Sequence, residues 1–113
     1  LVDKQAHDVA KEFVFTSSLK ISQLRKFYGD VKSLEQSWNY QQKSYTAFLG
    51  ILPQIKMLKA KAAYAQHRKL VRDSFVRWIN ENVDKINKPD DFKAFLLHFE
   101  AVVGFCYGEG LKD

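Results

Sequence analysis

The stretch FLGILPQIKMLKAKAAYAQHR, residues 48–68, decides the fold, because its apolar residues recur at the spacing of one face of an α-helix. On an unbroken helix, at about 100° per residue, that face collects Phe48, Ile51, Leu52, Ile55, Leu58, Ala62 and Ala65. Lys61 and Arg68 then lie nearly in line on the opposite side. Lys56 lies on the other flank, and Lys59 lies at the edge of the apolar stripe.

Pro53 interrupts this pattern. A proline inside a helix removes a backbone hydrogen bond and clashes with the preceding turn, at a cost of about 3 kcal/mol or more. The sequence leaves two alternatives open. Either a helix begins near Ile51 to Pro53, or a longer helix kinks at the proline.

Four further apolar stripes have helical spacing, within residues 2–13, 24–38, 71–86 and 92–106. By spacing, Phe92, Phe95 and Phe99 belong to the core, and Trp38 extends an apolar stripe. No segment shows sustained alternation of period two, so strands are not expected. The sequence therefore predicts an all-α, compact bundle of about five helices in a single helical domain over residues 1–113. How the N-terminal helix, residues 1–15, packs is left open.

Two helix starts carry recognisable signals. Ser22 is a candidate N-cap for the second helix. Pro89 fits the first turn of the last helix, where its missing N–H costs nothing. Asp90 and Asp91 follow it and face the positive end of the helix dipole, which we favour over a catalytic carboxylate pair.

Composition excludes several classes of protein. The chain has 113 residues, of which 46% are apolar and 14% aromatic, so it folds rather than remaining a disordered tail. Cys106 is the only cysteine, which excludes an intrachain disulfide and a zinc site built from cysteines. No apolar run approaches the roughly 18 residues of a membrane span. A cytoplasmic protein is the simplest interpretation.

Enzymatic sites are not evident in the sequence. His7, His67 and His98 are far apart and form no metal-binding pair. Cys106 falls on the apolar stripe of the last helix, the usual place for an inert buried thiol. The glycines form no phosphate-binding loop. We therefore expect no catalytic residues, no metal and no cofactor.

Positive charge is concentrated between Lys43 and Arg77. This third of the chain has eight basic residues and one acid, a net charge of +7, whereas the remainder carries −2. Such a segment attracts a polyanion, and its side chains would neutralise phosphates independently of sequence. Tyr64 shares a face with Lys61 and Arg68 and is a candidate for stacking on a base. A solvated face whose lysine stems cover apolar neighbours is the alternative.

A series of ordered motifs resembles the small subunit of the type III-A CRISPR–Cas Csm effector complex. They are SQLRKF at 22–27, LPQIKMLKAK at 52–61, AYA at 63–65 with Arg68, DF at 91–92 and EAVV at 100–103. The resemblance covers about residues 18–107, a family-like helical core. It implies a non-catalytic, all-helical subunit, present in several copies as an inner filament along the guide RNA–target RNA duplex.

The resemblance also implies partners and contact residues. The partners would be the guide RNA, the single-stranded target RNA, the backbone ribonuclease subunit, the large subunit and further copies of the chain. For the isolated subunit, self-association as a homodimer is an alternative to the filament. The candidate RNA-binding residues are Arg25, Lys56, Lys61 and Arg68 at matching positions, Lys59 as a weaker match, and Lys69 and Arg72 for their charge. The family pattern is not kept at residues 104–107, and residues 1–15 lie outside the match.

Two other functions are compatible with a small, basic, helical chain. A helix-turn-helix DNA-binding domain would need base-reading side chains at the start of its recognition helix. The basic helix instead has Leu52, Ile55 and Leu58 there. A helical adaptor that binds an acidic protein would have the same basic face. Its binding would survive high salt, whereas phosphate contacts weaken steeply.

Overall fold

The computed structural model describes residues 2–16 and 21–108, with side chains over 4–11 and 22–108. This part of the chain forms five helices and no strand, which confirms the predicted all-α bundle. The helices are α1 (Val2–Thr16), α2 (Ile21–Tyr40), α3 (Tyr45–His67), α4 (Asp73–Asp84) and α5 (Pro89–Gly108).

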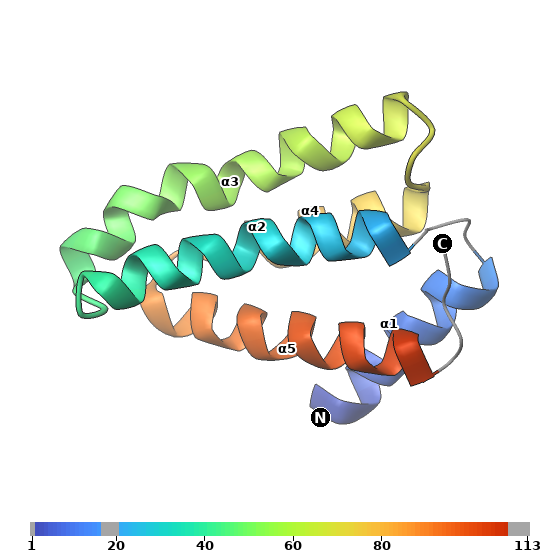
Figure 1. The fold of residues 1–113 in the computed structure, drawn as a ribbon, viewed down its shortest axis with the longest axis horizontal. Coiled ribbons are helices and arrows are strands. Elements are labelled where there is room, and N and C mark those ends of the chain that lie inside the picture. Colours follow the sequence, from blue (N-terminus) through green and yellow to red (C-terminus); the bar gives the residue numbers. More distant parts are fainter. Residues whose placement is uncertain (1, 17–20, 109–113) are drawn as a thin grey trace.

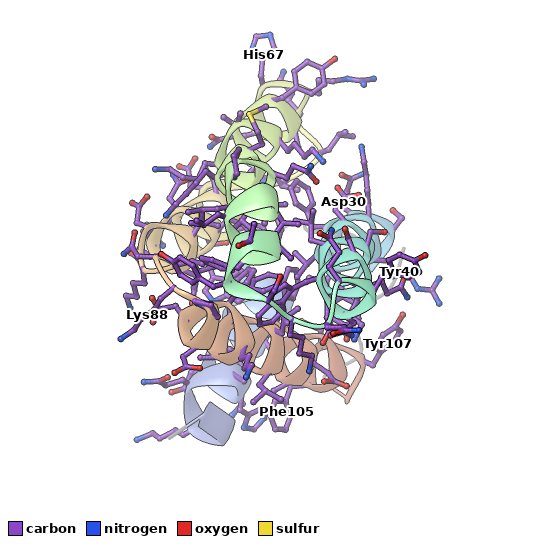
Figure 2. The ribbon with its side chains drawn as sticks, turned by 90° about the vertical axis from the view of Figure 1, so that its left-hand side faces the viewer. Asp30, Tyr40, His67, Lys88, Phe105 and Tyr107 are labelled. Carbon is purple, nitrogen blue, oxygen red and sulfur yellow. The ribbon has the colours of Figure 1, made fainter. Side chains whose placement is uncertain are left out.

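Helices α2 to α5 run alternately up and down, and each is joined to the next by a short turn (Figure 1). Helix α3 lies at one edge of the molecule and α1 at the other, with α2, α4 and α5 between them (Figures 1 and 2). Helix α3 packs on α4 and on α2, and α1 packs mainly on α5. None of the helices in these ranges combines the length and the apolar character needed to cross a bilayer.

The apolar stripes of all five helices meet in one hydrophobic cluster. Phe48, Phe92 and Phe99 are fully buried and Phe95 is 3% exposed, which confirms their predicted place in the core. Trp38 is also buried, with its ring centroid 5.6 Å from that of Phe92, and its indole N–H donates to the Ser44 carbonyl at 3.1 Å. This indole is therefore part of the core and is not available to stack on a nucleotide.

Helix α3 is continuous through Pro53, which excludes a helix that begins there. Pro53 and Leu49, whose carbonyl the proline cannot bond, are both exposed, so water can replace the missing hydrogen bond. The helix begins two turns earlier, where the Ser44 hydroxyl accepts from the Ala47 N–H at 3.0 Å. This N-cap was not among the predicted helix starts.

The other predicted helix starts have different outcomes. Pro89 is the first residue of α5, as expected, and Asp91 Oδ2 accepts from the backbone N–H of Asn87 at 3.0 Å and of Lys88 at 3.2 Å. The capping interpretation of this acid is thus confirmed. The N-cap predicted at Ser22 is wrong, because α2 is already helical at Ile21.

Helix α1 packs through two small residues, Ala6 and Ala10, which are both fully buried. Because alanine lets the backbones approach closely, the His7 ring reaches α5 and lies 4.9 Å from the Phe105 ring. Figure 2 shows Phe105 on the side of α5 that faces α1. Phe13, the largest member of the predicted N-terminal stripe, lies outside the described side chains.

Candidate nucleic-acid interface

A groove runs between α2 and α3 and contains two hollows. The first, of about 250 Å³, is called here the Tyr64 hollow; it is lined by Lys26, Phe27, Asp30, Lys61, Tyr64, Ala65, Arg68 and Leu70. The second, of about 380 Å³, is called the Met57 hollow; it is lined by Asp30, Ser33, Leu34, Gln54, Met57, Leu58 and Lys61. Lys61 Nζ lies 3.4 Å from Asp30 Oδ2, so this ion pair stands where the two hollows meet.

The helical phase of α3 explains why some of its cations line this groove. Residues Phe48, Ile55 and Ala62 turn inward and are buried, and the two flanks of their stripe face different neighbours. Lys61 and Arg68 lie on the flank toward α2, with Tyr64 between them in the chain. The predicted alignment of these two cations is confirmed, but they lie on the flank toward α2 and not on the side opposite the apolar stripe.

Tyr64 and Arg68 form a pair within the hollow. The guanidinium carbon of Arg68 lies 5.8 Å from the centroid of the Tyr64 ring, one helical turn away, in a cation–π contact. The Tyr64 side chain is nevertheless 62% exposed. Its exposure agrees with the sequence-based choice of Tyr64 as a stacking candidate, and the hollow beside it is walled by Phe27, Ala65 and Leu70.

Lys26 joins this group from α2, although the sequence did not single it out. It lines the Tyr64 hollow with Lys61 and Arg68, one turn before Asp30 on the same flank of α2. Three cations and one carboxylate therefore surround the hollow, so positive charge dominates there. Lys26 could have been found from the helical phase of α2. That phase places Lys26 and Asp30 on one flank of the apolar stripe of α2 and Arg25 on the other flank.

Arg25 is directed to a different part of the molecule. Its guanidinium carbon lies 5.9 Å from the centroid of the Tyr107 ring on α5. Helix α2 does lie beside α3. The flank of α2 that carries Arg25 faces α5, however, and Figure 2 shows Tyr107 on the α2 side of that helix. Arg25 is thus not part of the groove.

Lys56 and Lys59 are on the flank of α3 that faces α4. Lys56 Nζ donates to the Val83 carbonyl oxygen at 2.9 Å, in the last turn of α4. Lys59 Nζ lies 2.5 Å from Asp84 Oδ1. Both ammonium groups therefore bind the C-terminal end of α4, where the helix dipole and the acid favour positive charge.

Lys69 and Arg72 lie in the turn from α3 to α4 and are exposed. Lys69 has a φ of 62°, and this left-handed residue reverses the chain just after the helix. It stands between Arg68 and Leu70, which both line the Tyr64 hollow. Arg72 is the N-cap residue of α4. The turn therefore adds charge at one end of the groove.

Outside the groove, a histidine of α5 is hydrogen-bonded to a tryptophan of α4. Trp78 Nε1 donates to His98 Nε2 at 3.3 Å, and the Trp78 ring packs edge-on against Phe99 at 5.0 Å. Burial lowers the pKa of His98, and the positive charge of Lys85 lowers it further. This is a structural contact between α4 and α5. Within the described residues, no three His, Cys, Asp or Glu side chains gather as metal ligands.

The groove combines positive charge with exposed apolar side chains. Ammonium and guanidinium groups are the groups that neutralise phosphates. Met57, Tyr64 and Leu70 are large side chains that remain partly exposed along the groove. Interleaved cations and aromatic rings are the arrangement by which proteins bind single-stranded nucleic acid without reading its sequence.

Comparison with known proteins agrees with the motif resemblance. A scan against family models matches residues 1–108 to the family described as Csm2 Type III-A. The match begins at residue 1 and so includes the N-terminal residues that the motifs did not cover. No match was found among curated proteins or among solved structures. The chain belongs to the Csm2 type III-A family, the structural small subunits of the type III-A CRISPR–Cas Csm complex.

Proposed function

We propose that this chain is a non-catalytic RNA-binding subunit that lines the guide RNA–target RNA duplex through the α2–α3 groove. Lys26, Lys61 and Arg68 contact the phosphates, and Lys69 and Arg72 add charge at the end of the groove. Several copies stack as an inner filament, beside the backbone ribonuclease subunit and the large subunit. The observation that supports this most is the groove itself, with three cations around an exposed tyrosine in a Csm2 family member.

The physical requirements of the role agree with the groove. In a guide complex, base pairing reads the sequence, so a lining subunit must accept every target. Phosphate neutralisation and shape supply affinity without sequence preference. A head-to-tail contact between copies would let the filament follow the RNA, because such a contact is heterologous and does not close on itself.

Three of the RNA-binding residues predicted from the sequence are not assigned to RNA. Lys56 and Lys59 bind the end of α4, and Arg25 lies over the Tyr107 ring. No contact in the described part of the chain favours the helix-turn-helix alternative. The basic helix α3 buries Ile55 and Leu58 in the core, and Leu52 packs against it, where that alternative needs base-reading side chains.

Binding of the purified chain to RNA and DNA across a salt series tests the proposal. The probes are two single-stranded RNAs of unrelated sequence, an RNA duplex and a DNA duplex, all of equal length. We expect RNA binding that is indifferent to sequence and that weakens linearly on a log–log salt plot. Sequence-specific binding of duplex DNA would contradict the proposal. Binding of no nucleic acid, with salt-resistant capture of an acidic protein, would favour the adaptor instead.

A further inference from the structure

We propose that the Tyr64 hollow receives one unstacked base of the bound RNA strand. This rests on the function proposed above and goes beyond it, because lining a duplex requires only phosphate contacts. The base would lie against Tyr64 and the apolar wall of Phe27 and Leu70. Lys26 and Arg68 would contact the phosphates on either side of that nucleotide.

The size and walls of the hollow suit a planar ring. Its volume is about 250 Å³. A cavity of about 150 Å³ is already enough to hold benzene. Phe27 and Ala65 are nearly fully buried, at 3% and 6% exposed, and they line the hollow with Leu70. A phosphate group would lose its hydration against this wall, whereas a base would exchange water for apolar contact.

Two of the three cations of the hollow, Lys26 and Arg68, form no ion pair with the acid that lines it. Lys61 is paired with Asp30 where the two hollows meet. The Arg68 guanidinium lies over the Tyr64 ring in the cation–π contact, while the ring stays 62% exposed. Since every base has a π-face, stacking on Tyr64 would not select a sequence. A base in this hollow is therefore compatible with a subunit that accepts any target.

Exposed apolar side chains along the α2–α3 groove favour a bound ligand there. Met57 is 53% exposed and Leu70 is 36% exposed, and both line the same groove as Tyr64. Scattered exposed residues need no explanation, but a row of them among cations marks a binding surface. The cations at the rim of the hollow favour an anionic ligand, and the apolar wall favours a ligand that also has an apolar part. A nucleotide combines both properties.

The test compares a base-bearing strand with a strand that has none. Labelled oligouridine and an equally long oligomer of abasic spacers, which keeps the phosphates, are titrated with the chain. We expect wild type to bind oligouridine at least about fivefold more tightly. Tyr64→Ala should weaken only the base-bearing strand and so abolish this difference. Tyr64→Phe, which keeps a ring, should retain it.

A matched control is Tyr40→Ala, because Tyr40 is a tyrosine that is 90% exposed at the far end of α2. It should retain the wild-type difference, and circular dichroism should show unchanged helix content in all variants. Equal wild-type affinity for the two strands would overturn this inference and leave the phosphate-binding function intact. Failure of wild type to bind either strand would overturn both.

Discussion

The Lys61 ammonium and the Asp30 carboxylate meet 3.4 Å apart across the α2–α3 groove, with side chains 52% and 36% exposed. This pair holds one of the groove's three cations against an acid. Because both groups are well solvated, the pair contributes little to the free energy of unfolding, about 0–1 kcal/mol. Its main effect is on the charge available to a bound strand.

Replacement of Asp30 by asparagine should therefore strengthen RNA binding. Removing one negative charge near a phosphate is worth roughly 1 kcal/mol, or about fivefold in affinity at low salt, and the gain should fade as salt rises. Fluorescence anisotropy with single-stranded RNA measures it. Asp84→Asn is the matched control, because Asp84 pairs with Lys59 on the other flank of α3. Weaker binding by Asp30→Asn would show that the acid positions Lys61 for RNA.

Lys56 should prove to be a structural residue. Lys56→Met keeps the aliphatic stem but loses the 2.9 Å hydrogen bond to the Val83 carbonyl, which retains backbone donors such as the Ile86 N–H at 3.0 Å. We expect a loss of about 1–2 kcal/mol in the free energy of unfolding by urea titration, with unchanged RNA affinity. Lys59→Met should cost less than about 1 kcal/mol, since its ion pair is exposed. If Lys56→Met lowered the RNA affinity but kept wild-type stability, Lys56 would be an RNA-binding residue and not a structural one.

Phe95→Ala tests the core of α5. The Phe95 side chain is 3% exposed, and its ring lies 5.6 Å from Phe99 and 6.1 Å from Trp78. Removing it should lower the free energy of unfolding by about 3–5 kcal/mol. Leu97→Ala, two residues along but 63% exposed, should change it by less than about 0.5 kcal/mol. Similar small costs for both variants would contradict the packing of this helix.

The burial of His98 predicts a pH dependence of stability. The pKa of His98 lies below its ordinary value of about 6.5, so the unfolded chain binds this proton more readily than the folded chain. Stability from His98 is then complete above pH 6.5 and is lost as the pH falls through the lowered pKa. His98→Gln cannot bind the proton but can still accept from the indole, so its melting temperature should fall less between pH 7.5 and 5.

Exposed His67 provides the control for that measurement. His67→Gln should follow the wild-type melting curve at each pH. If His98→Gln lost stability with falling pH as steeply as wild type, the proton would be taken up elsewhere in the molecule.

Much of the fold follows from the period of the apolar residues. Phe48, Phe92 and Phe99 are buried where their spacing places them, because each stripe can be covered only by another stripe. That α3 continues through Pro53 could not be derived in this way. The free-energy cost of a proline inside a helix depends on whether water reaches the Leu49 carbonyl. This access depends on which side of α3 faces the neighbouring helices.

The candidate site was predicted less completely, for a related reason. Periodicity separates the two flanks of a helix but does not say which neighbour each flank faces. Lys61 and Arg68 were grouped correctly because Lys61 lies in α3 and Arg68 is the C-cap residue of the same helix. Arg25 was chosen and Lys26 was missed because their assignment depends on which flank of α2 meets α3. The acceptor of Lys56 is a backbone carbonyl on α4, which leaves no mark in the side-chain pattern.

The most direct test of the central claim is the salt dependence of RNA binding when two groove charges are removed. Lys61→Gln with Arg68→Gln should weaken binding to single-stranded RNA and reduce the log–log salt slope by about 1.4, or roughly 0.7 for each lost phosphate contact. Lys11→Gln with Lys88→Gln removes the same charge from exposed positions away from the groove and should leave the slope nearly unchanged. Equal changes in the two double variants would contradict an RNA site in the α2–α3 groove.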